Sequence, residues 1–547
     1  MEAEEKKTYS YRKPDAKPDR FWLPAVLFMA VSLGVLMGYF INQITRDNEV
    51  VFSSYSGESS VLDEVMSLID AKYVDTLSLD RLREKAIERL LAGLDPHSTY
   101  IPPRELTEVT QDMEGEFEGV GIEFHLLNDT IYVVSAISGG PSEMAGIRAG
   151  DRIVKVNDTT VAGTGITNDG VLKKLRGRKG SAVRLGIKRN GLKDLVSFTI
   201  LRDKIPIYSI DAAYLADPQT AYIKINRFSA TTVDEFKEKL RPLVEKGAKN
   251  LVLDLRQNPG GFLNAAIDIL DELIAGKKLL LYTEGKAYSR QEYLSARPGM
   301  MEDGNITVIV DQGSASASEI IAGAVQDLDR GWVVGRTTFG KGLVGEQYEL
   351  MDGGALRLTV ARYYTPSGRC IQKPYQNGAE AYHNEVYDRF TQGRLTQEDT
   401  LKADTLIYRT SRLKRIVKGG GGIRPDVFVP LDTSLLASGL LQIRAEVPEF
   451  TYAWASDHPE YTKDYSSYGD FAARFQVPAD MKQAFADHLA RKKVSGTITV
   501  AATRELESLM CAYIARNCWK LDGFYYVLNQ SDAEYKAALQ QISKPVQ

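Results

Sequence analysis

The stretch ITVIVDQGSASASEIIAGAVQDL, residues 306–328, places a loop of glycine and serine between an apolar run and a helical pattern. Such short apolar runs are typical of strands buried on both faces of a parallel sheet, and three more occur at AYIKINRF, NLVLDLR and WVVG. Helical segments are predicted among them at 232–245, 264–276 and 316–328. The alternation predicts an α/β domain at 205–430, with a polar insertion at 371–418. In such a domain, loops at the carboxyl ends of the strands carry the chemistry.

Upstream, residues 114–204 contain β-rich runs separated by glycine turns, with a helical stretch at 168–176. The segment resembles a PDZ domain, on GVGI at 119–122, PSEMAG at 141–146 and AGD at 149–151. GVGI alone favours an ordinary glycine turn, whereas the later motifs in register favour the PDZ interpretation. The resemblance implies a peptide-binding loop, formed by Gly119, Val120, Gly121 and Ile122. Its N–H groups would capture a chain-end carboxylate while the adjoining strand pairs with the peptide.

The regions outside these two segments carry helical patterns. Apolar residues recur at helical spacing from Ser60 to about Gln111, interrupted by LDPHSTYIPP at 94–103, which predicts a small helical domain at 58–113. Residues 431–547 are polar with helical periodicity in their last third, which predicts a mainly helical C-terminal domain. A chain of 547 residues is too long for one hydrophobic core, so a multidomain architecture is expected.

Residues 21–41, FWLPAVLFMAVSLGVLMGYFI, contain no charged residue. As a helix they would extend about 31 Å, which matches a bilayer core. Lys and Arg concentrate on the N-terminal side, at Lys6, Lys7, Arg12, Lys13, Lys17 and Arg20, whereas only Arg46 follows closely. The positive-inside rule therefore predicts a cytoplasmic tail at 1–20, a single-pass inner-membrane anchor at 21–42, a linker at 43–57 and a periplasmic remainder. A cleaved signal peptide is the alternative, but no small-x-small cleavage site follows the apolar run.

Composition excludes several classes of function. A net charge of −4 does not indicate nucleic-acid binding, which needs a concentrated basic face. Cys370, Cys511 and Cys518 fit no metal spacing, and a helix through 503–519 would hold the last two too far apart for a disulfide. We expect free cysteines, no metal site and no cofactor.

Three loop segments carry the residues from which a catalytic site could be built. Asp254–Gly261 ends in adjacent glycines, which let backbone N–H groups approach a ligand closely. Ser316 would stand at a helix N-terminus, although Ser316-x-x-Glu319 also fits a capping box and alone favours a helix cap. Lys341 lies between glycines in FGKG; such a lysine is often solvated, but burial would lower its pKa and make it a general base.

Together these segments resemble the C-terminal processing peptidases (tail-specific proteases, serine peptidase family S41) over roughly residues 60–430. Five motifs of that family occur in order: NPGG at 258–261, GSASASE at 313–319, FGKG at 339–342, YTPSGRCIQ at 364–372 and GIRPD at 422–426. The resemblance implies a crotonase- or ClpP-like core with Ser316 as nucleophile and Lys341 as general base. Their interval, 341 − 316 = 25, matches the family's usual one. It also implies oxyanion donors from Ala317 and from Gly260 or Gly261.

The sequence departs from the family pattern at the residue that orients the base. The family commonly has a glutamine four residues after the lysine, where this chain has Gly345. Glu346 or Gln347 could substitute, and we favour Gln347 because a carboxylate would raise the pKa of the lysine. The resulting prediction is a membrane-anchored, extracytoplasmic serine endopeptidase that cleaves proteins near their C-termini, guided by the PDZ-like domain.

Two other functions fit the sequence less well. A trypsin-like triad is disfavoured because none of the five histidines, His97, His125, His383, His458 and His488, lies within the α/β strands and helices, and His97 fits a turn histidine. A membrane-tethered scaffold with a decayed peptidase domain is supported by Gly345 but opposed by Ser316 and Lys341 together. Arg176, after the PDZ-like helix, is a candidate link between peptide binding and activation, or a plain surface arginine. Homo-oligomerisation through 431–547 stays open.

Overall fold

The computed structural model describes residues 61–398, 406–433, 439–458, 460–496 and 498–546, and the chain divides into two compact units, Met1–Leu82 and Arg83–Gln547. In the first unit the described residues form α2, Val61–Lys72, none of which is buried, and the start of α3, Leu79–Ala92. None of the described helices combines the length and apolarity needed to cross a bilayer. The predicted anchor at 21–42, with the tail and linker beside it, lies outside the described residues.

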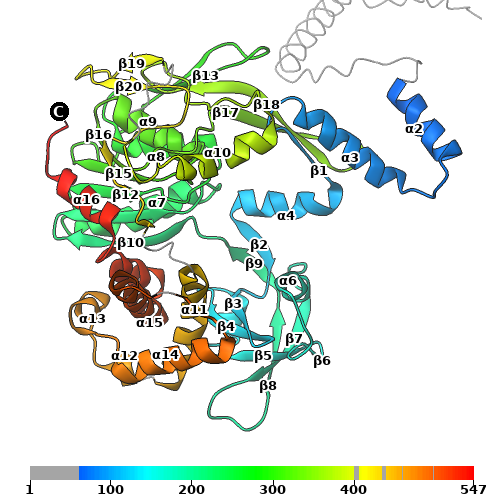
Figure 1. The fold of residues 1–547 in the computed structure, drawn as a ribbon, viewed down its shortest axis with the longest axis vertical. Helices are drawn as coiled ribbons and strands as arrows, with labels where there is room; N and C mark the ends of the chain where they lie inside the picture. Colours follow the sequence, from blue (N-terminus) through cyan, green and yellow to red (C-terminus); the bar gives the residue numbers. More distant parts are fainter. Residues whose placement is uncertain (1–60, 399–405, 434–438, 459, 497, 547) are drawn as a thin grey trace, which may run out of the picture. The chain divides into compact units, whose positions relative to one another are not determined.

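The second unit contains a β-rich domain whose sheet runs β3-β4-β5-β7-β8 and leaves β3 at an edge, with β6 beside β5 (Figure 1). Alternate residues of these strands are apolar and pack with α6 into one buried cluster, as expected for a sheet with one covered face. A two-stranded ribbon, β2-β9, connects this domain to the rest of the chain. The elements are β2 (Glu116–Gly119), β3 (Ile122–Leu127), β4 (Thr130–Ala136), α5 (Pro141–Met144), β5 (Arg152–Val156), β6 (Thr159–Thr160), α6 (Asn168–Leu175), β7 (Ala182–Lys188), β8 (Val196–Leu201) and β9 (Asp203–Pro206).

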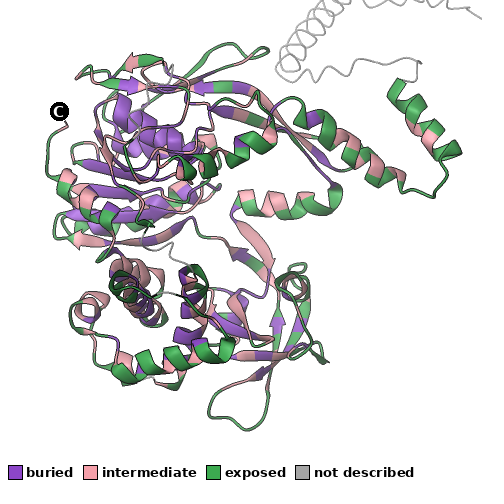
Figure 2. Cartoon of the chain, viewed as in Figure 1, coloured by how far each residue is buried: buried purple, intermediate pink, exposed green. Residues whose placement is uncertain are grey.

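The α/β domain is built on a six-stranded sheet in the order β10-β11-β12-β15-β16-β21. All neighbours pair in parallel except β10 and β11, as the continuous apolar runs predict. Every residue of β15 and of α9 is buried (Figure 2), so the serine loop, residues 311–316, joins two rigid elements. The elements are β10 (Ile210–Asp217), β11 (Thr220–Ile225), α7 (Thr232–Glu245), β12 (Asn250–Asp254), α8 (Leu263–Leu273), β15 (Ile306–Val310), α9 (Ala317–Asp327), β16 (Gly331–Gly335) and β21 (Val427–Phe428).

A second sheet of this domain runs β1-β18-β13-β14, with β17 also paired to β18. Its first strand comes from the LDPHSTYIPP segment, so part of the predicted N-terminal helical domain is a strand of the peptidase sheet. In its described residues, 371–398 and 406–418, the predicted insertion contains one helix and a short hairpin. The elements are β1 (Thr99–Ile101), α4 (Pro103–Glu114), β13 (Leu279–Glu284), β14 (Gln291–Leu294), β17 (Leu343–Glu349), β18 (Ala355–Tyr364), α10 (Ala379–Thr391), β19 (Ile407–Arg409) and β20 (Ile416–Lys418).

The C-terminal region is helical and has its own apolar cluster. Its long helix α15 has non-helical backbone at Trp519 and Lys520, and its last helix, α16, lies against β12, β15 and β16 (Figure 1). Cys370, Cys511 and Cys518 are free. The elements are α11 (Leu440–Asp457), α12 (Glu460–Lys463), α13 (Tyr468–Arg474), α14 (Ala479–Lys492), α15 (Val500–Asn529) and α16 (Ala533–Ile542).

Candidate active site

Ser316 lies in the turn between β15 and the N-terminus of α9, at the carboxyl end of a central strand. Its φ of +53° and ψ of −113° are unfavourable for a residue with a side chain, at a cost of about 1–3 kcal/mol. The turn is held from outside: the N–H of Ala315 and the hydroxyl of Ser318 both donate to the carbonyl of Asn258 at 3.0 Å. The 254–261 loop therefore fixes the shape of the serine loop.

The two glycines of the NPGG motif lie against Ser316. A Cβ atom on Gly260 would stand 2.7 Å from Ser316 Cβ and 2.9 Å from the backbone nitrogen of Ala317, so only glycine fits. The N–H of Gly260 donates to Asn258 Oδ1 at 2.8 Å. By contrast, no hydrogen-bond acceptor for the N–H of Ala317 or of Gly261 occurs among the described residues. Of the predicted oxyanion donors, these two therefore have N–H groups available for a substrate oxygen.

A single buried carboxylate joins the serine loop to the lysine loop, residues 336–342 between β16 and β17. Glu319, in the first turn of α9, is fully buried. Its oxygens accept from the N–H groups of Ser316 (2.9 Å), Gly340 (2.7 Å) and Lys341 (2.8 Å) and from the hydroxyl of Thr338 (2.6 Å). Burial raises the pKa of Glu319, whereas these hydrogen bonds oppose the rise. The capping-box pattern identified Glu319 only as a local cap and missed its contact with the lysine loop.

Ser316 and Lys341 line the same cavity, of about 1100 Å³. Burial lowers the pKa of Lys341 from its ordinary value of 10.5, and the positive charge of Arg357 lowers it further. Glu319 and Asp95 oppose this shift. The amine is thus biased toward its neutral form, which a general base for a serine hydroxyl requires.

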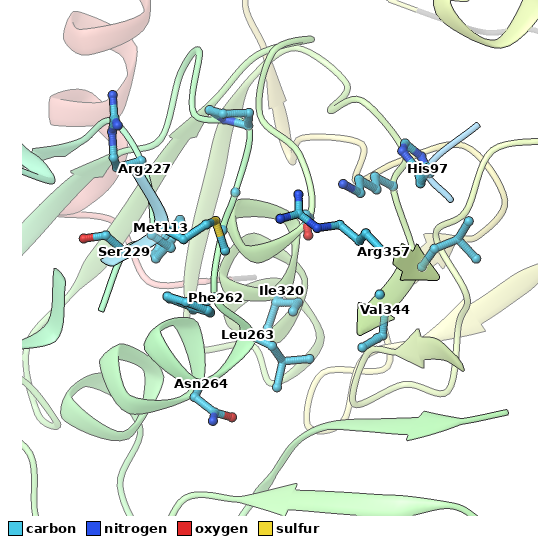
Figure 3. A pocket seen from close by; sticks show the side chains of 18 of the residues that line it. His97, Met113, Arg227, Ser229, Phe262, Leu263, Asn264, Ile320, Val344 and Arg357 are labelled. Carbon is cyan, nitrogen blue, oxygen red and sulfur yellow. The ribbon is translucent and has the colours of Figure 1, made fainter. Parts of the chain in front are cut away.

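Figure 3 shows the cavity with the guanidinium of Arg357 extending into it. One wall is apolar, and it combines residues that follow the NPGG motif with residues of α9 and β17. Those labelled in the view are Phe262, Leu263, Ile320 and Val344. An apolar wall beside Ser316 is suited to uncharged substrate side chains.

The predicted orienting residue, Gln347, also lines this cavity, and its Oε1 accepts a hydrogen bond from Arg357 Nη2 at 3.1 Å. No hydrogen bond between Gln347 and Lys341 is present in the described part of the chain. Glu346, the other residue considered, faces elsewhere, since its carboxylate accepts from the hydroxyls of Tyr288 and Tyr348 at 2.7 Å. Arg357, which sequence reasoning missed, is thus the charged neighbour of both Gln347 and Lys341.

His97 belongs to the same cavity, together with the turn that carries it. Asp95 accepts from the N–H of His97 at 2.8 Å and from the hydroxyl of Thr359, on β18, at 3.0 Å. Burial, followed by the charge of Lys341, lowers the pKa of His97 to about 4, so the imidazole is neutral near pH 7. Its Nε2 lies 2.9 Å from the hydroxyl of Tyr382. The LDPHSTY motif therefore forms part of the cavity wall, whereas its sequence indicated only a turn.

The predicted peptide-binding residues Gly119, Val120, Gly121 and Ile122 connect β2 to the edge strand β3. Arg176 ends α6 of the same domain: its Nη1 lies 2.6 Å from Glu108 of α4, and its guanidinium lies 5.1 Å from the centre of the Phe117 ring. Residues 110–114 of α4 include four that line the cavity. Arg176 thus contacts α4, whose C-terminal residues line the cavity.

Comparison with known proteins agrees with this architecture. The profile of peptidase family S41 matches residues 219–379, and the PDZ domain profile matches residues 119–204. The chain is 34% identical over 361 residues to the carboxy-terminal processing protease CtpB of Bacillus subtilis, which covers 65% of this chain and 74% of that protein. It is 34% identical over 353 residues to the carboxy-terminal-processing protease of Bartonella bacilliformis, covering 64% and 79%.

Among solved structures, the photosystem II D1 C-terminal processing protease is 30% identical, with a TM-score of 0.32, and covers 56% of this chain and 88% of that one. The predicted family resemblance is confirmed by the CtpB match, which spans three quarters of that relative at 34% identity. The chain belongs to the carboxy-terminal processing proteases, PDZ-containing serine peptidases of family S41.

Proposed function

We propose that the protein is a membrane-anchored, extracytoplasmic endopeptidase that cleaves proteins near their C-termini, with Ser316 as nucleophile and Lys341 as general base. One observation carries the proposal: both residues line one cavity, and the buried carboxylate of Glu319 holds both of their loops. Membership in the family supports the reaction, and the lowered pKa of Lys341 supports its role as the base.

In this mechanism the neutral amine of Lys341 takes the proton of Ser316 Oγ as that oxygen attacks the peptide carbonyl carbon. The N–H groups of Ala317 and Gly261 bind the resulting oxyanion. When the C–N bond breaks, the ammonium of Lys341 returns the proton to the leaving amine, and an ester on Ser316 remains. A water molecule then attacks the ester while Lys341 takes its proton, and the acid product leaves as Ser316 recovers its hydrogen.

Substrate C-termini are proposed to bind the PDZ-like domain. Strand β3 is an edge strand whose backbone can pair with an extended peptide, and the turn at 119–122 precedes it. The contact of Arg176 with Glu108 lies between this domain and the helix that lines the cavity. Peptide binding at α6 and β3 can therefore alter the cavity through α4.

Replacing Arg176 with alanine is expected to reduce cleavage of a protein substrate about 5- to 150-fold, the usual range of an allosteric coupling. Hydrolysis of a short peptide that does not reach the PDZ-like domain should be unchanged, because the cavity residues are untouched. Initial rates on the two substrates, measured side by side, check this. Equal loss on both would refute the gating role.

The experiment that tests the proposed function uses the full chain in membranes washed with alkaline carbonate, which retain spanning proteins. We expect the washed pellet to cleave an unstructured protein with an apolar C-terminus, with fragments located near that end by mass spectrometry. The same substrate with an amidated C-terminus should be cut more slowly, because the PDZ-like turn recognises the carboxylate. Activity in the wash would contradict the anchor, and uniform cleavage along the substrate would contradict C-terminal recognition.

A further inference from the structure

Glu534, in the first turn of α16, is bound by two arginines of the peptidase domain. Its Oε2 accepts from Arg256 and its Oε1 accepts from Arg336, both as ion pairs. Glu534 and Arg336 are each 7% exposed, so these charges are paired within the protein interior. Glu534 does not line the active-site cavity, so it does not touch a substrate there.

Each of these arginines belongs to a different catalytic loop. Arg256 is two residues before Asn258, whose side chain and carbonyl hold Gly260 and the serine loop. Its guanidinium also binds Asp254, at the end of β12, and Asp532, the N-cap of α16. Glu534 therefore fixes the start of the NPGG loop from outside the cavity.

Arg336 directly follows β16 and begins the segment that leads to Lys341. Its Nε donates to Oε1 of Gln312 at 3.0 Å, and Gln312 lies in the serine loop four residues before Ser316. Its backbone N–H bonds the carbonyl of Val310, the last residue of β15. Arg336 thus links the lysine loop to the serine loop, and its guanidinium forms an ion pair with Glu534.

Two loops bind this carboxylate directly, through Arg256 and Arg336, and the serine loop is joined to it indirectly through the hydrogen bond from Arg336 to Gln312. The carboxylate comes from a helix outside the α/β domain. Truncating one partner of a buried charge pair leaves the other charge without compensation, which is strongly unfavourable. With Glu534 uncharged, Arg256 keeps two other acidic partners, whereas Arg336 keeps the amide of Gln312. The lysine loop is therefore expected to move more than the NPGG loop.

We propose that Glu534 is a positioning residue of the protease: from α16 it fixes the NPGG, serine and lysine loops relative to one another. The inference rests on the proposed roles of Ser316 and Lys341. The proposal gives the C-terminal region a part in catalysis. If the loops that carry Ser316 and Lys341 shift by about 1 Å, the rate can fall about 100-fold.

The test compares Glu534→Gln, which keeps the shape and removes the charge, with Asp487→Asn, which removes an exposed carboxylate of the same helical region. On a short peptide, kcat of Glu534→Gln should fall about 10- to 100-fold with KM within about twofold, since the substrate-binding walls are unchanged. Asp487→Asn should behave as wild type. A wild-type kcat for Glu534→Gln, or a loss of kcat shared by Asp487→Asn, would overturn the proposal.

Hydrogen exchange tests the positioning role of Glu534 independently of activity. Amides at 336–341 should exchange about tenfold faster in Glu534→Gln, because the charged hydrogen bonds that hold that loop are weakened, and those at 256–261 should exchange faster by less. If Glu534→Gln does not fold, Arg336→Gln replaces it and should speed exchange at 336–341 and at 311–316, which Arg336 also contacts, but not at 256–261. Unchanged exchange in both loops would refute the positioning role even if the variant proved inactive. If the wild type cleaves nothing but Glu534→Gln still shows the faster exchange, only the proposed function is refuted.

Discussion

Ser316→Ala is expected to abolish proteolysis, with kcat lower by on the order of 10⁴- to 10⁶-fold. The hydroxyl is the proposed nucleophile, and the described site offers no second hydroxyl in the same position between Gly260 and Ala317. The fold should survive, because Glu319 bonds the backbone N–H of residue 316 and not its side chain. Fragment release followed by mass spectrometry, with thermal unfolding of the same preparation, measures both effects.

The matched control is Ser318→Ala, two residues further on in the first turn of α9. The hydroxyl of Ser318 donates to the carbonyl of Asn258 and is buried, so its loss should weaken the loop without removing the reaction. If Ser316 were only a helix cap, Ser316→Ala would cost about 1 kcal/mol of stability and leave the protease active. That result would refute the nucleophile assignment.

Lys341→Met is expected to lower kcat by on the order of 10²- to 10⁴-fold at pH 8, the usual contribution of a general base. Methionine preserves the apolar stem and removes the amine, so binding of the substrate should change little. Lys286→Met, at an exposed turn, serves as the control and should be fully active. Full activity of Lys341→Met would require another base and would leave the dyad without support.

The pH dependence provides a sharper test of the same assignment. In wild type, kcat should rise with pH through one ionisation below 10.5, because burial and Arg357 lower the pKa of Lys341 and only the neutral amine accepts a proton. Arg357→Met removes the positive charge, so the pKa of Lys341 should increase and the rising limb should move to higher pH. Activity lost at pH 7 should then return at high pH. Equal loss at every pH would mean that Arg357 is needed only for structure.

If every version binds a C-terminal peptide but none cleaves, the scaffold function would replace the peptidase function. Gly345 supports this alternative, since the family resemblance implies a glutamine at that position to orient the base. Arg357 and Gln347 occupy that part of the cavity wall instead. Substitutions of Ser316 and Lys341 therefore distinguish an active protease with a different orienting residue from a domain that has lost its peptidase activity.

Local patterns were sufficient to locate the elements that carry the loops. The helix predicted at 232–245 is α7, Thr232–Glu245, and the stretch predicted at 168–176 contains α6, Asn168–Leu175; both predictions are confirmed. The multidomain α/β architecture with a PDZ domain and an S41 domain is also confirmed. These features follow from periodicity and short motifs, which act over a few residues.

The residues that the sequence did not reveal have partners far along the chain. His97 meets Tyr382 across 285 positions, and Glu534 meets Arg256 across 278. No periodicity encodes such pairs, and an isolated Glu at a helix start is explained equally well by the helix dipole. Glu319 shows what a local pattern can and cannot predict. Its bond to Ser316 follows from the capping pattern, whereas its bonds to the lysine loop do not.

The position of Glu534 in the chain has a consequence for biosynthesis. A ribosome adds about 5–20 residues per second, and 534 − 341 = 193 residues separate Lys341 from Glu534, so roughly 10–40 s pass between them. During that interval the proposed nucleophile, the proposed base and the glycine loop have all been synthesised, while Glu534, the proposed positioning residue, has not. If Glu534 is the positioning residue, we therefore expect the nascent chain to be weakly active until α16 has been synthesised and docked.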